Sequence, residues 1–133
     1  MIAAPPDVIR WAPRSQGHGD CAIAAVSLAC GVTYEVALAA ALAFEPEVLT
    51  EGLSLKNIEK TVQQLGLTTK RRRKFELDED TGILTIPGHA VYLWEGRILE
   101  PASSLCNLWL NAQAYLSHYK AKAGVLIEVT REE

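Results

Sequence analysis

The stretch Asp20–Gly31, which reads DCAIAAVSLACG, decides how the fold begins. Asp20 is a preferred N-cap residue, because its carboxylate can accept hydrogen bonds from the unpaired N–H groups of a first helical turn. Gly31 is a typical helix stop, since glycine readily adopts the left-handed conformation that ends many helices. The residues between them are small or apolar. The sequence therefore predicts a buried helix from Cys21 to Cys30.

Two further helices are predicted in the first half of the chain. Thr33 is an N-cap for a helix that runs to about residue 43, with Glu35 in its first turn. Ser54 is an N-cap for a third helix, which ends at Gly66. Its apolar residues recur at helical spacing: Leu55, Ile58, Val62 and Leu65.

The pattern after Gly66 is typical of strands. A two-residue loop, Glu95-Gly96, separates two apolar runs and predicts a β-hairpin. The predicted strands are 67–75, 83–86, 89–94, 97–100 and 125–129, and an amphipathic segment containing Leu108, Ala112, Tyr115, Leu116 and Tyr119 precedes the last of them. Helices first and antiparallel strands later indicate an α+β fold, in which N-terminal helices pack on a C-terminal antiparallel sheet.

Size and composition predict one domain that spans residues 1–133. The chain has 49% hydrophobic and 22% charged residues, the balance of an ordinary globular domain. A net charge of -3 argues against a dedicated nucleic-acid-binding protein. The most apolar stretch, 22–44, is interrupted by Thr33, Tyr34 and Glu35, so we expect no membrane span.

The cysteines and the N-terminal sequence point to the cytoplasm. Three cysteines at irregular spacing do not form a disulfide framework, and residues 1–7 lack the basic and apolar regions of a signal peptide. Cys21, Cys30 and Cys106 also lack the close pairs of zinc sites. We therefore expect reduced thiols and neither a metal nor a cofactor.

Cys21 is the candidate nucleophile. At the first position of a capped helix, unpaired N–H groups and the helix dipole favour the thiolate form. The same N–H groups can stabilise an oxyanion on a bound acyl group. The alternative is a small cysteine packed in the core, which is common for this residue type.

His89 and Glu100 are the candidate partners of Cys21. If Glu95-Gly96 is the hairpin loop, Trp94 pairs with Arg97, and strand alternation places His89 and Glu100 on one face of the hairpin. Their Cα atoms are then diagonal neighbours, ~7 Å apart, a distance that a glutamate can bridge. A thiol, an imidazole and an orienting carboxylate form an activated nucleophile. A solvated carboxylate at the end of a strand is the alternative for Glu100.

These residues resemble the papain-like cysteine peptidases, and among them the small C39-like group related to the bacteriocin-processing peptidases. The resemblance lies in Gln16 ahead of Asp20-Cys21 at a helix start, Gly88–Tyr92 on a strand, and the run 98–101, which ends in Glu-Pro. It covers residues 14 to 129. It implies a papain-like fold and a cysteine hydrolase acting on a peptide or protein substrate.

The resemblance also implies a role for each residue. Cys21 would be the nucleophile, His89 the general base and acid, Gln16 an oxyanion donor, and Glu100 the residue that orients His89. Gln16 is one residue closer to Cys21 than the family usually has it, Ala22 replaces a common glycine, and Glu100 replaces Asp or Asn. A degenerate member that acts as a protein-interaction or ligand-binding module is therefore the alternative function.

Three other features have open interpretations. His18, between two glycines, is an alternative base or a lining residue of the cleft, and His118 suits a helix C-terminus. The basic run Lys70–Lys74 reads as a charged edge strand that resists aggregation, or as a docking site for an acidic protein partner. Aromatic residues do not interleave with its charges, which argues against RNA or DNA.

Overall fold

The helices of the first half begin and end where the sequence predicts. The computed structural model describes residues 21–48, 52–86, 89–99, 109–118 and 120–131. Its helices are α1 (Cys21–Cys30), α2 (Tyr34–Leu42), α4 (Leu55–Gln64) and α5 (Ala112–His118). The Thr33 and Ser54 side chains accept hydrogen bonds from the N–H groups of the first turns of α2 and α4. Gly31 and Gly66 follow α1 and α4 with φ of 69° and 88°, the left-handed conformation of a helix stop.

The strands form one antiparallel sheet. They are β1 (Leu67–Arg72), β2 (Thr81–Ile86), β3 (His89–Trp94), β4 (Arg97–Leu99), β5 (Trp109–Asn111) and β6 (Leu126–Arg131). Their order across the sheet is β1-β6-β2-β3-β4-β5, so the last strand of the chain lies between the first two. The α+β prediction, with N-terminal helices packed on an antiparallel sheet, is confirmed.

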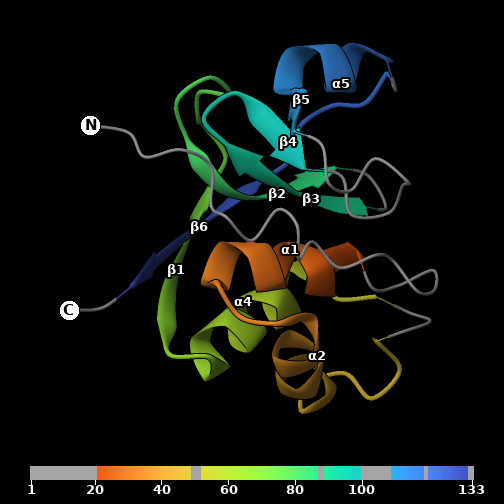
Figure 1. Cartoon of the computed structure of the whole chain (residues 1–133), viewed down its shortest axis with the longest axis vertical. Helices are drawn as coiled ribbons and strands as arrows, with labels where there is room; N and C mark the ends of the chain where they lie inside the picture. The colour runs from red at the N-terminus through yellow and green to blue at the C-terminus, as the bar shows by residue number, and fades with distance from the viewer. Residues whose placement is uncertain (1–20, 49–51, 87–88, 100–108, 119, 132–133) are drawn as a thin grey trace.

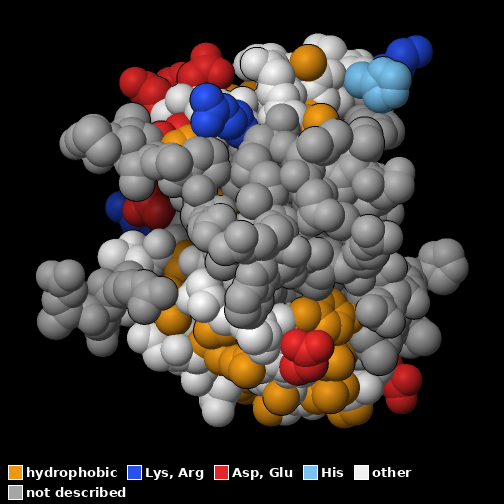
Figure 2. Space-filling view, viewed as in Figure 1, with side chains coloured by type: hydrophobic (Ala, Val, Ile, Leu, Met, Phe, Trp, Pro, Cys, Tyr) orange, Lys and Arg blue, Asp and Glu red, His pale blue; other side chains and the backbone are white. Residues whose placement is uncertain are grey.

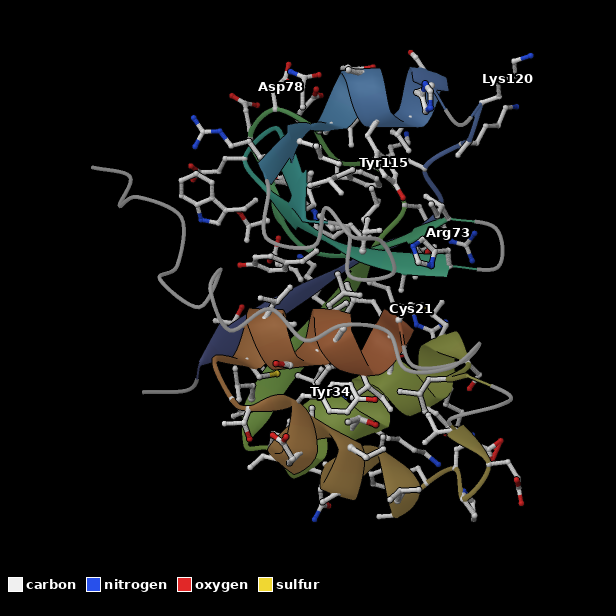
Figure 3. All side chains as sticks on the ribbon, turned by 45° about the vertical axis from the view of Figure 1, so that its right-hand side comes forward. Cys21, Tyr34, Arg73, Asp78, Tyr115 and Lys120 are labelled. Atoms are coloured by element: carbon white, nitrogen blue, oxygen red, sulfur yellow. The ribbon has the colours of Figure 1, made fainter. Side chains whose placement is uncertain are left out.

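The sheet separates two apolar clusters. On one face, α1, α2 and α4 pack against the sheet through Ile23, Val26, Ile58, Ile83 and Ala90, among others. On the other face, α5 packs through Tyr115 and Leu116 onto strand residues that include Leu84, Val91, Leu93 and Ile98. Figure 1 shows the two arrangements, with the three helices below the strands and α5 above them. Tyr115 projects from α5 toward the strands in Figure 3.

Several predicted strands have other bounds in the structure. β2 begins at Thr81 rather than at residue 83, and β6 spans Leu126–Arg131 rather than 125–129. β1 ends at Arg72 rather than at Phe75, because its pairing with β6 ends at Arg72 opposite Leu126. The segment before β6 contains a short strand, β5, in addition to the amphipathic helix α5. β5 pairs with β4, and the Ala112 N–H donates to the Gly96 carbonyl at 2.8 Å. β5 therefore forms through contacts with a segment that precedes it in the sequence rather than through a local signal.

α1 and α2 are apolar on more than one side. Within the described residues no single helix is long and apolar enough to cross a membrane, and the pair α1 and α2 passes that test only together, across a bend of 117°. α1 is almost completely buried. α2 exposes Val36 and Leu42, and Figure 2 shows hydrophobic side chains gathered over α2 at the bottom of the view.

Candidate functional site

Cys21 is the first residue of α1 and remains half-buried while the helix behind it is buried. Its thiol is free, and its side chain packs at the margin of the apolar cluster that contains Ala22, Ala25 and Ala90. Figure 3 shows Cys21 at the N-terminal end of α1, where the helical half of the molecule meets the strands. Cys30, at the other end of α1, is buried. Of these two thiols, Cys21 is the one that a reagent can reach.

His89 is the first residue of β3 and is also half-buried. It lies opposite Ile86, the last residue of β2. Strand alternation places the His89 Cβ on the face of Val91, which packs with α5, whereas Ala90 belongs to the cluster under α1. His89 thus lies at the end of the strand, on the face opposite the one that α1 covers.

α1 and β3 pack together and run in the same direction. Burial, together with smaller contributions from the nearby Cys30 and Glu95, raises the pKa of Tyr92 to about 12. The contribution of Cys30 places the C-terminal end of α1 near Tyr92, three residues into β3. The N-terminal end of α1, at Cys21, therefore lies toward the start of β3, and in Figures 1 and 3 both ends are on the same side of the molecule. Cys21 and His89 therefore lie toward the same end of α1 and β3, with His89 on the face of the sheet opposite α1.

The β3–β4 hairpin has the register that the sequence predicts. Trp94 pairs with Arg97, and the pairing continues to Tyr92 and Leu99. Glu95 and Gly96 form the two-residue turn with φ of 44° and 89°. Both angles are positive, as in the type I′ turns that connect tight hairpins.

Gln16, His18, Glu100 and Cys106 lie outside the described residues. The structure therefore describes two of the four predicted catalytic residues, Cys21 and His89. Tyr92, beside Cys30, is the perturbed group that the sequence analysis did not single out. Tyr92 lies two positions after Ala90 on β3 and so shares its face of the strand. This alternation could have indicated from the sequence that Tyr92 is buried. Its phenol is 5% exposed and stays neutral near pH 7, so it acts as a packing residue.

No metal site is visible in the part of the chain that the structure describes. None of its groups of His, Cys, Asp or Glu side chains has three members placed to hold an ion.

The fold is similar to that of a solved protease. No protein-family model matches the sequence, and no curated protein sequence is significantly similar to it. A solved structure described as a double glycine motif protease from an AMS/PCAT transporter, in complex with the leader peptide, is 15% identical, with a TM-score of 0.58. The match covers 90% of this chain and 98% of that one. The chain therefore has an α+β fold of the papain-like peptidase type.

Proposed function

We propose that this protein is a papain-fold cysteine hydrolase that cleaves a peptide or another acyl bond. Cys21 is the nucleophile, His89 is the general base and acid, Gln16 donates a hydrogen bond to the oxyanion, and Glu100 orients His89. The observation that carries the proposal is the parallel packing of α1 on β3, since α1 begins at Cys21 and β3 begins at His89. The papain-like fold supports it further.

The chemistry follows from these roles. The Cys21 thiolate attacks the carbonyl carbon and forms a C–S bond, and the negative charge moves to the carbonyl oxygen. That oxygen accepts hydrogen bonds from Gln16 and from the Cys21 N–H at the start of the helix. His89 gives its proton to the leaving amine as the C–N bond breaks, which leaves a thioester on Cys21. His89 then takes a proton from water, the hydroxide attacks the thioester, and the acid product and the thiol are released.

The burial of α1 suits this role. A nucleophile must be held within about 0.5 Å of its productive position, which a helix fixed in the core achieves better than a loop. Ile23, Ala24, Ala25 and Val26 are 0% exposed and fix α1 against its neighbours. Cys21 is half-exposed at the end of that rigid element, so a substrate can approach it without movement of the helix.

The substrate class that we propose is a peptide or a protein. The similar protease was solved with a leader peptide, and its chain has nearly the same extent as this one. A domain of this size has little surface for substrate selection, so we propose that a partner or a neighbouring domain contributes specificity. The thiol of Cys21 also suits a reducing compartment, and we propose the cytoplasm.

The test is the pH dependence of alkylation of Cys21 by iodoacetamide, read by intact mass. An activated pair labels rapidly well below about pH 8, where an ordinary thiol is mostly protonated. Labelling at this position disappears in Cys21→Ala and is slowed about tenfold or more in His89→Ala. His118→Ala is the matched control, because His118 is exposed at the end of α5 and distant from α1 in sequence and sheet order.

Labelling of Cys21 at the rate of an ordinary thiol, with no difference between the wild type and His89→Ala, would contradict the proposal. The chain would then be a papain-fold interaction module. A specific observation favours that second function: β1 is an open edge strand that carries most of the basic run at 70–74. It predicts that Cys21→Ala leaves the biological activity intact and that charge changes in β1 remove it.

A further inference from the structure

β1 is an edge strand, and the hydrogen bonds of its neighbours show which of its peptide groups are unpaired. The Thr85 N–H donates to the Val125 carbonyl at 3.0 Å, and the Gly124 N–H donates to the Thr85 carbonyl at 2.8 Å. Ile127, opposite Ile83, follows the same alternation, so its peptide groups also point toward β2. The intervening β6 residues, Leu126, Glu128 and Thr130, therefore direct their peptide groups toward β1.

The residues of β1 then divide into two sets. Thr68, Lys70 and Arg72 lie opposite Thr130, Glu128 and Leu126, so their peptide groups bond to β6. Thr69 and Arg71 direct their N–H and carbonyl groups away from β6, toward the open edge. No backbone hydrogen bond within the described residues reaches these groups. The edge thus offers two unpaired donors and two unpaired acceptors at strand spacing.

α4 and neighbouring carboxylates hold the strand in place. The Gln63 side-chain amide donates to the Thr69 hydroxyl at 2.9 Å, and the Arg71 guanidinium contacts Glu59 of α4 at 2.7 Å. On the other face, Arg72 contacts Asp80 at 3.1 Å and Glu128 at 3.0 Å. The edge is therefore fixed before any partner arrives, which lowers the entropic cost of binding.

Three cations near this edge form no ion pair with a described residue. Lys70, Arg73 and Lys74 are exposed and have no ion pair with any residue that the structure describes. Figure 3 labels Arg73, which follows the end of β1. Because Arg71 and Arg72 already pair with Glu59, Asp80 and Glu128, these three side chains are the cations of the basic run that are left for an approaching segment.

We propose that the β1 edge binds an extended acidic peptide segment of a partner protein, which adds as a strand beside β1. The peptide groups of the partner satisfy those of Thr69 and Arg71, and its carboxylates face Lys70, Arg73 and Lys74. This docking site is distinct from Cys21 and does not depend on the proposed hydrolase activity.

The same charges exclude two other occupants. A second copy of β1 would bring Lys70, Arg73 and Lys74 near identical cations, and like charges on neighbouring strands are destabilising. A nucleic acid has no peptide groups to pair with Thr69 and Arg71, and it would gain only the contacts to the cations. The combination of unpaired peptide groups and unpaired cations therefore favours an acidic polypeptide.

The experiment measures fluorescence anisotropy of a fluorescein-labelled peptide of alternating threonine and glutamate, titrated with the full chain at low salt. We expect saturable binding that weakens as salt is added. The double variant Lys70→Glu/Lys74→Glu should bind about tenfold more weakly or not at all. The double variant Lys120→Glu/Lys122→Glu has the same change in net charge in the segment between α5 and β6, outside β1, and should bind like the wild type.

A second peptide separates strand addition from simple attraction. It has the same charges, but alternate peptide nitrogens are methylated so that the edge it presents cannot donate hydrogen bonds. We expect it to bind at least about tenfold more weakly than the parent peptide, since a strand needs its backbone donors. Equal binding of the two peptides, no binding of the parent peptide at low salt, or tighter binding of a single-stranded oligonucleotide of equal charge would each overturn the proposal.

Discussion

Trp94 lies opposite Arg97 across the β3–β4 turn, and the Arg97 guanidinium is 5.5 Å from the centre of the indole ring. This cation–π contact closes the hairpin at its tight end. The pairing fixes the register of every residue farther along the two strands, because a slip of one residue would turn each side chain to the other face. The position of His89 at the start of β3 therefore depends on a turn five residues away.

The Glu95–Gly96 turn predicts a stabilising substitution. Glu95 has a φ of 44°, which a glutamate adopts at a cost, whereas asparagine tolerates this conformation and is preferred in type I′ turns. We expect Glu95→Asn to raise the free energy of unfolding by about 0.5 kcal/mol or more. Urea denaturation measures the change. Glu95→Gln is the matched control: it removes the same charge without the turn preference, and an equal gain in both variants would contradict the explanation.

The register also gives a prediction for Glu100. The described pairing ends at Tyr92 and Leu99, and Glu100 lies outside the described residues, so its place on the face of His89 remains the prediction of the sequence analysis. If Glu100 orients His89, Glu100→Ala should slow alkylation of Cys21 by about tenfold near neutral pH and shift its pH profile, and Glu100→Asp should restore part of the rate. Glu79→Ala, which removes an exposed carboxylate elsewhere, is the control. A pH profile unchanged in Glu100→Ala would leave His89 to act without this carboxylate.

Local signals account for the elements that the sequence predicted well. The caps Thr33 and Ser54, the stops Gly31 and Gly66, and the turn at Glu95–Gly96 each act within a few residues, so the chain specifies them independently of the rest of the fold. The α1 and β3 starting points follow from such signals. That α1 packs along β3 does not, because contacts between segments far apart in the sequence decide it.

Long-range pairing accounts for what the sequence did not predict. β5 is only three residues long and exists because it pairs with β4 and because Ala112 bonds to Gly96. The placement of β6 between β1 and β2 brings together residues far apart in the sequence, such as Arg72 and Leu126. The unpaired peptide groups of Thr69 and Arg71 follow from that order and have no signature in a single strand.

The tight contact between α1 and the sheet predicts a difference between two alanines. Ala25 in α1 is 0% exposed and packs in the cluster under β3, whereas Ala39 in α2 is exposed. Ala25→Leu should lower the free energy of unfolding by about 2 kcal/mol, because the added carbons have no space. Ala39→Leu should change it by less than about 0.5 kcal/mol. Thermal or urea denaturation compares them, and equal effects would show that α1 is not closely packed.

Ala25→Leu should also slow the alkylation of Cys21 if the position of α1 matters for reactivity. The alkylation rates of the variant and of the wild type are compared under conditions in which both proteins are folded. A displaced α1 moves Cys21 relative to His89, and a shift of about 1 Å can cost about a hundredfold in rate. A variant that is less stable but labels at the wild-type rate would show that Cys21 reacts without help from His89.

Tyr92 predicts a loss of stability in alkaline solution. Burial raises the pKa of its phenol to about 12 in the folded chain, from an ordinary value of 10.0 in the unfolded chain. Above about pH 10 the unfolded chain releases this proton while the folded chain retains it, so the unfolded state binds fewer protons and stability falls as pH rises. The contribution is fully present below about pH 10 and decreases by about 1.4 kcal/mol per pH unit until the folded chain also ionises, about 3 kcal/mol in all.

Tyr92→Phe isolates this effect, because the other alkaline groups titrate in both proteins. Its free energy of unfolding, followed by urea denaturation from about pH 8 to about pH 12, should fall less steeply than that of the wild type. We do not expect the variant to be more stable than the wild type at neutral pH, where the neutral phenol fills its site. The difference in the free energy of unfolding should move in favour of the variant by about 3 kcal/mol at the alkaline end. Tyr34→Phe keeps Tyr92 and should retain the wild-type slope. If the difference in unfolding free energy between the wild type and Tyr92→Phe stays constant with pH, the phenol ionises in the folded chain as readily as in the unfolded one. The burial of Tyr92 would then not raise the pKa of its phenol.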